Sequence, residues 1–86
     1  MKIHALKTWS CYFDDVAAGR KRYEIRYDDR DFSIGDVVVL VETPTGSETI
    51  TRRIAVVRIT SILRGFDGLT PGFIAFSFDP VSVQVV

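Results

Sequence analysis

Alternating apolar and polar positions run through most of this chain, and a helical spacing interrupts them only near the N-terminus. Within residues 9–17 the apolar side chains recur at intervals of three and four, so they share one face of an α-helix. Thr8 stands where a capping residue is favoured, and Gly19 stands where a left-handed residue commonly ends a helix. We therefore predict one helix, over about residues 9–18.

The other apolar segments predict five or six short β-strands. An apolar, β-branched run over residues 37–41 is typical of a strand that is buried on both faces or closed into a barrel. Glycine, proline and polar clusters separate the segments, and the longest such connection covers residues 64–72. The predicted strands are residues 1–6, 23–27, 37–41, 49–63, 73–78 and 81–86, with Asp79 and Pro80 separating the last two.

The strand predicted over residues 23–27 has two unlike faces. Tyr23, Ile25 and Tyr27 lie on one side of it, whereas Glu24 and Arg26 lie on the other. Charged side chains are rarely buried without partners, so we expect the Glu24 and Arg26 side to face away from the core.

The strands as a set favour a closed arrangement, because most of them lack a purely polar face. An open, single-layer sheet would leave one apolar face in water, and a sheet curled into a barrel avoids this. The sequence thus predicts a mainly β (α+β) fold, a small barrel of five to six strands with the N-terminal helix packed at the barrel opening. A chain of 86 residues fits one domain, residues 1–86.

Charge narrows the range of partners. Eleven basic and eleven acidic side chains cancel, so no global positive field attracts nucleic acid, and any such binding must be local. Residues 20–30 hold the one basic cluster. Cys11 is the only cysteine, which excludes an internal disulfide and a thiolate metal cluster and favours a reducing, cytoplasmic setting. We expect no metal, no cofactor and no membrane-spanning segment.

Residues 19–26 carry the most specific pattern in the chain, G-x-K-x-x-E-x-R, formed by Gly19, Lys21, Glu24 and Arg26. An ammonium suits a phosphate, a carboxylate accepts from a base amino group, and a guanidinium fork suits a phosphate or a guanine edge. The alternative is an ordinary solvated strand face. The pattern resembles the signature of the ASCH superfamily, whose members have a PUA-like β-barrel and are mostly suspected of binding RNA.

Two further segments are similar to that superfamily. Residues 32–36 read F-x-x-G-D, which follows the signature in ASCH domains, and residues 4–9 read H-x-L-K-x-W, like a small bacterial and phage family within it. The resemblance covers about the first 40 residues. It implies a cleft between helix and barrel that holds RNA or a modified nucleotide, lined by Lys21, Glu24 and Arg26. Lys7 and Trp9 stand just before the predicted helix, so we expect them to border the same cleft.

Some ASCH members are ribonucleases or amidohydrolases, which makes enzymatic RNA or nucleoside processing the alternative function. Lys21 and Glu24 are then the candidate catalytic pair for proton transfer. In the amidohydrolases a threonine occupies the position of Glu24 and a later loop supplies an acid, for which this chain offers only Asp67. A third reading is a protein-interaction domain, and the oligomeric state stays open.

Several residues carry both a structural and a functional interpretation. Trp9 either packs in the core or stacks on a base, with the core the commoner outcome. His4 is expected as a partly buried strand residue and Cys11 as a small packing residue. The remaining aromatic side chains that we assign to the core by default are Tyr12, Phe13, Phe66, Phe73, Phe76 and Phe78.

Overall fold

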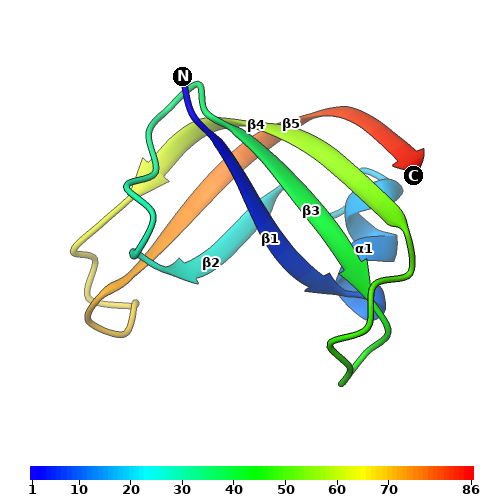
Figure 1. Ribbon diagram of the computed structural model, residues 1–86. Coiled ribbons are helices and arrows are strands. Elements are labelled where there is room, and N and C mark those ends of the chain that lie inside the picture. Colours follow the sequence, from blue (N-terminus) through cyan, green and yellow to red (C-terminus); the bar gives the residue numbers. More distant parts are fainter.

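The computed structural model describes residues 1–86, as five strands in one sheet and a single helix (Figure 1). The sheet has the strand order β1-β3-β4-β5-β2, in which β1 and β3 run parallel and every other neighbouring pair runs antiparallel. The elements are β1 (Ile3–Trp9), α1 (Ser10–Ala17), β2 (Tyr23–Tyr27), β3 (Val37–Thr43), β4 (Arg53–Leu63) and β5 (Phe73–Val85).

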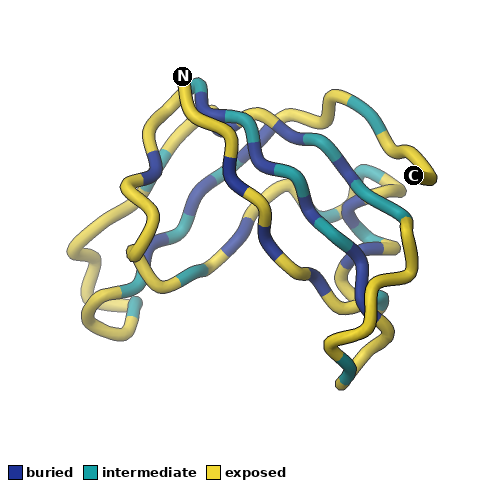
Figure 2. Tube along the Cα trace, viewed as in Figure 1, coloured by how far each residue is buried: buried dark blue, intermediate teal, exposed yellow.

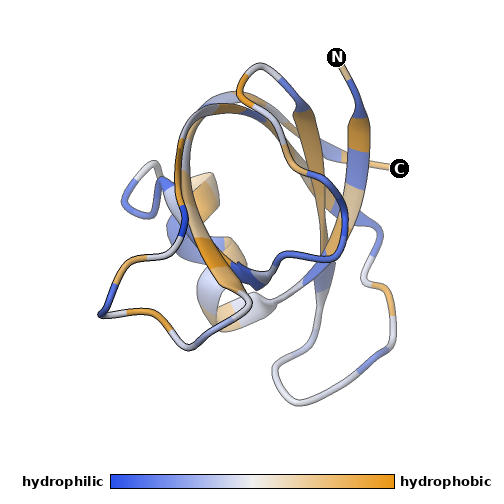
Figure 3. Cartoon of the chain, turned by 90° about the vertical axis from the view of Figure 1, so that its left-hand side faces the viewer, coloured by the Kyte–Doolittle hydropathy of each residue, from blue (hydrophilic) through white to orange (hydrophobic).

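The sheet curls strongly (Figure 3), and its two edge strands, β1 and β2, approach each other closely enough for a hydrogen bond from Arg26 of β2 to reach β1. No backbone ladder joins them, and the result is a half-barrel rather than the closed barrel that we predicted. Side chains instead bridge the gap between β1 and β2, which we call the seam. Arg26 donates to the carbonyl of Lys7 at 2.6 Å, and Arg30 donates to the carbonyl of Ala5 at 2.8 Å. Two edge carbonyls of β1 are thereby satisfied without a neighbouring strand.

One apolar core fills the inside of the curled sheet, and α1 covers part of it at one end (Figures 1 and 2). The helix contributes Phe13 and Val16, and its neighbours are β1, β3 and β4. The mainly β class and the helix at one end of the sheet are confirmed. The core residues are Leu6, Phe13, Val16, Phe32, Val38, Leu40, Ala55, Val57, Ile59, Ile74, Phe76 and Phe78.

The start of the helix differs from the prediction. β1 continues to Trp9, which pairs with Thr43 of β3, so the helix begins only at Ser10. Thr8 is therefore a strand residue, and Trp9 occupies the capping position without a side-chain cap. Trp9, Tyr12 and Phe66 are 44%, 51% and 58% exposed, so their assignment to the core was wrong.

β2 has the predicted bounds, but its faces are reversed. Glu24 is only 5% exposed and Arg26 is half-buried, whereas Tyr23, Ile25 and Tyr27 are all more than half exposed. The charged face of β2 points into the half-barrel because each of its charges finds a partner there, as described below. The prediction that this face looks away from the core is corrected.

The C-terminal half also departs from the predicted boundaries. β4 begins at Arg53, four residues later than expected. β5 runs through Asp79 and Pro80 without a break, since the register against β4 shifts between Val56 and Val57, opposite Pro80. Such a bulge admits a residue that lacks an N–H. The single helix is eight residues long, and no helix has the length and apolar character needed to span a bilayer.

The F-x-x-G-D segment forms a structural junction between β1 and β3. Asp36 is 2% exposed and accepts from His4 at 2.8 Å, from the N–H of Lys2 at 2.9 Å and from the N–H of Ser33 at 3.0 Å. Burial on its own raises the pKa of Asp36, but these hydrogen bonds outweigh it and lower the pKa to about 2. His4 is thus a buried structural residue, as expected, whereas Cys11 is exposed and is not a packing residue.

Candidate functional site

A cleft of about 710 Å³ lies over the seam between β1 and β2, next to α1. Ligand pockets for small molecules commonly have volumes of about 300–1,000 Å³. All five residues that the sequence pointed to, namely Lys7, Trp9, Lys21, Glu24 and Arg26, line this one cleft. The other lining residues are Thr8, Tyr12, Tyr23, Ile25, Tyr27, Thr43, Glu48 and Phe73.

The Glu24 carboxylate joins the two motif cations. Its Oε1 accepts from the Lys21 ammonium at 2.5 Å, and its Oε2 accepts from Nε of Arg26 at 3.0 Å. The spacing of the G-x-K-x-x-E-x-R motif explains why Lys21 reaches Glu24. Gly19 adopts the left-handed region (φ +78°) after α1 and turns Lys21 back toward the start of β2. Glu24 and Arg26 then project from the same strand face. An ammonium, a carboxylate and a guanidinium therefore meet in one partly enclosed place.

Lys21 is held from several sides. Besides Glu24, its ammonium donates to the carbonyl of Tyr23 at 2.7 Å. It also lies 5.0 Å from the centre of the Tyr23 ring and 5.9 Å from that of Tyr12, within the range of cation–π attraction. An ammonium has three donors, so one has no hydrogen-bond partner in the protein.

Arg26 is fixed at two of its three nitrogens. Nε donates to Glu24, and Nη2 donates to the carbonyl of Lys7 at 2.6 Å and lies 3.5 Å from the Thr8 hydroxyl. Nη1 has no partner in the protein, and the side chain is 29% exposed. The guanidinium is thus oriented by the strands on both sides of the seam and keeps donors for a ligand.

Aromatic side chains rim the cleft at both ends. The Trp9 and Tyr12 rings are nearly parallel, with centroids 6.4 Å apart and an interplanar angle of 8°. Tyr27 meets Phe73 edge to face at 5.6 Å. Of these four, only Trp9 was singled out by the sequence. The alternation of tyrosines with charges in residues 23–27 was the available signal, but we assigned that aromatic face to the core.

The charges of the cleft nearly balance. Lys7, at the rim, pairs with Glu48 at 2.6 Å, and both side chains are more than half exposed. Three cations and two carboxylates line the cleft, which leaves an excess of one positive charge. Thr43, which is 1% exposed, also lines it, and its hydroxyl has no hydrogen-bond partner.

Other candidate groups lie elsewhere. Asp67 lines a separate hollow formed by the loop between β4 and β5, so it is not among the groups of the cleft. Arg53 binds Glu42 at 2.7 Å and Asp14 at 2.9 Å, tying α1 to β3 and β4. Hydrogen bonds from Arg53, against the opposing effect of burial, lower the pKa of Glu42 to about 2. Arg58 donates to the carbonyl of Gly35, and Arg52 donates to the carbonyl of Val86.

Comparison with known proteins places this chain in a family. Residues 3–78 match the family described as Domain of unknown function (DUF3850). The "Uncharacterized 12.9 kDa protein in GpA 3'region" of Escherichia phage P2 is 41% identical over 61 residues, which are 71% of this chain and 54% of that protein. The chain thus spans about half the length of this relative.

Proposed function

Because the chain belongs to the DUF3850 family, a domain of unknown function, we propose a function from the geometry of its own cleft: it binds single-stranded RNA or a nucleotide there. The G-x-K-x-x-E-x-R and F-x-x-G-D segments support the further proposal that the fold is the PUA-like fold of the ASCH superfamily. The half-barrel with a helix at one end is compatible with that assignment.

One observation carries the proposal. Lys21 and Arg26 flank Glu24 in a cleft whose rim includes exposed aromatic rings. Cations that hold a backbone phosphate, together with aromatic faces on which bases stack, are the two features that single-strand binding proteins combine. Glu24 holds both cations in place and keeps lone pairs that can accept from a base amino group.

The charge distribution also favours a small, single-stranded ligand. The chain as a whole has no net charge, and the cleft has an excess of one positive charge. A duplex presents one negative charge per about 1.7 Å, which a protein of this charge balance is not built to neutralise.

The test is the affinity of the protein for a fluorescently labelled single-stranded RNA of six nucleotides, measured by anisotropy. Lys21→Gln and Arg26→Gln should each weaken binding by about 10- to 100-fold, since each removes a charge-assisted hydrogen bond worth about 1.5–3 kcal/mol. Arg22→Gln is the matched control, because Arg22 lies in the same segment, is 56% exposed and does not line the cleft. Equal affinities for all three variants and the parent would rule out the assigned roles.

The same incubation separates binding from catalysis. Lys21 and Glu24 are already bonded to each other, and both oxygens of Glu24 accept from cations, which favours an organising role over proton transfer. We therefore expect the RNA to be recovered intact. Shortened RNA, absent from a Glu24→Gln preparation, would establish the enzymatic alternative instead.

A further inference from the structure

We propose that the unit bound in the cleft is a dinucleotide step of single-stranded RNA, with one phosphodiester at the Lys21–Glu24–Arg26 cluster and its two bases splayed onto aromatic pairs at opposite ends. The inference rests on the proposed function and specifies its ligand. It follows from where the aromatic pairs lie relative to the cations.

The first aromatic pair, Trp9 and Tyr12, lies at the start of β2. The Lys21 ammonium is 5.9 Å from the centre of the Tyr12 ring and 5.0 Å from that of Tyr23, the first residue of β2, so these groups are neighbours. Trp9 is 44% exposed and Tyr12 is 51% exposed, and their rings are stacked with nearly parallel planes. Two parallel, half-exposed rings offer a flat surface to a base.

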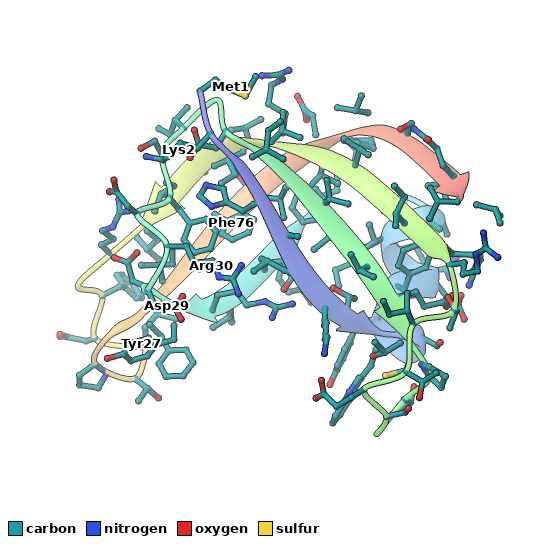
Figure 4. All side chains as sticks on the ribbon, in the orientation of Figure 1. Met1, Lys2, Tyr27, Asp29, Arg30 and Phe76 are labelled. Atoms are coloured by element: carbon teal, nitrogen blue, oxygen red, sulfur yellow. The ribbon has the colours of Figure 1, made fainter.

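The second pair, Tyr27 and Phe73, lies at the other end of β2. Figure 4 shows Tyr27 at the end of the strand that is remote from α1. Phe73 supports its ring edge to face, and a Cβ added to Gly72 would lie only 3.0 Å from the Tyr27 ring. The Tyr27 ring is therefore backed by Phe73 and by the backbone of Gly72, yet the residue stays 57% exposed.

The length of β2 separates the two pairs. Tyr23 and Tyr27 are four residues apart on one strand, which corresponds to about 13 Å at roughly 3.3 Å per residue. Neighbouring bases stacked in a duplex are only about 3.4 Å apart. One base on each pair therefore requires the two bases to be unstacked, which a single strand allows and a duplex does not.

The two motif cations provide for one phosphate: Lys21 adjoins the first pair, and Arg26 directly precedes Tyr27 of the second pair. Lys21 and Arg26 are the two motif cations on either side of Glu24, and Lys7 is paired with Glu48. The remaining excess of one positive charge matches a single phosphodiester. A longer strand would carry further phosphates. The single excess positive charge of the cleft is neutralised by the first phosphodiester, so it cannot pair with them.

The experiment is a calorimetric titration of the protein with AMP, the dinucleotide ApA, the trinucleotide ApApA, and an ApA analogue that lacks one base. ApA should bind about tenfold more tightly than AMP or the one-base analogue, since a stacked base contributes on that scale. ApApA should bind within about threefold of ApA, because its third nucleotide finds no further platform.

Variants locate the two bases. Trp9→Ala and Tyr27→Ala should each weaken ApA binding about tenfold. Phe66→Ala should leave it unchanged, since Phe66 is equally exposed, at 58%, but lies outside the cleft. If AMP binds as tightly as ApA, or if affinity keeps rising with each added nucleotide, the dinucleotide inference is wrong while RNA binding stands. If none of the ligands binds, the proposed function itself is wrong.

Discussion

At the scale of single residues, the site depends on Glu24. A carboxylate that is 5% exposed is stable only if it is paired, and here each of its oxygens accepts from a different cation. The same two bonds hold the cations at the cleft. The motif spacing is thus a structural requirement, with lysine three residues before the glutamate and arginine two residues after it.

Glu24→Gln should lower the free energy of unfolding by about 2 kcal/mol, because it leaves two poorly solvated cations with a neutral partner. Glu48→Gln is the matched control. Its ion pair with Lys7 is exposed, so the loss should stay below about 1 kcal/mol. Urea denaturation of both variants measures the difference, and equal losses would contradict the organising role of Glu24.

Asp36 should make the stability of the protein sensitive to acid. Its folded-state pKa of about 2 lies below the ordinary value of about 4, so it stabilises the folded state above pH 4. That contribution is lost as the pH falls from about 4 to about 2. Asp36→Asn should be less stable at pH 7 and should lose less stability on acidification than the parent protein, as measured by urea denaturation at each pH.

Asp67→Asn provides the comparison for this measurement. Asp67 is exposed and takes part in no ion pair, so its substitution should change the stability at pH 7 by less than about 0.5 kcal/mol. An Asp36→Asn variant that matched the parent at pH 7 would show that the hydrogen bonds to Asp36 do not stabilise the fold.

At the scale of elements, β2 shows what alternation can predict. Its bounds and its two-residue period were correct, because both follow from the pattern alone. Its orientation was wrong, because the pattern does not say which face is inside. Burial of the charged face depends on partners, and one of them, the carbonyl of Lys7, comes from a strand remote in the sequence.

The other boundary differences have similar causes. Trp9 fits a helical face in the sequence, but parallel pairing with β3 keeps it in a strand. Pro80 is a strand-breaking signal, yet a register shift in the β4–β5 ladder accommodates it. The end of the helix was predictable, since Gly19 has the left-handed conformation that the sequence suggested.

Gly19 connects α1 to β2, and its conformation should be costly to replace. A Cβ at Gly19 would meet no atom within 4 Å, so Gly19→Ala tests the backbone conformation alone. It should destabilise the protein by about 1 kcal/mol, the usual cost of a left-handed conformation for a residue with a side chain.

Gly68→Ala serves as the control, since Gly68 has no left-handed conformation. A Cβ added there would have the flexible Phe66 side chain as its nearest contact, at 3.4 Å. It should have a smaller effect in thermal or urea denaturation. Equal losses at the two positions would contradict the argument for Gly19.

At the scale of the whole molecule, the cleft is a product of the strand order. Residues 7–9 and 21–27 come together because β1 and β2 are the two edges of a sheet that curls on itself. The local motif predicted three of the lining residues, and the position of Lys7 and Trp9 just before the predicted helix added two. The remaining rim, including Tyr12, Tyr27, Phe73 and Glu48, required the pairing order, which local sequence patterns do not contain.

The most direct test of the account is an NMR titration of ¹⁵N-labelled protein with the dinucleotide ApA. Trp9 is the only tryptophan, so its indole N–H gives a single resonance at the rim of the cleft. We predict that this resonance and the backbone amides of residues 23–27 shift together and saturate at one site. Shifts confined to the outer C-terminal part of β5, or no shifts at millimolar ApA, would contradict the claim that this cleft binds single-stranded RNA.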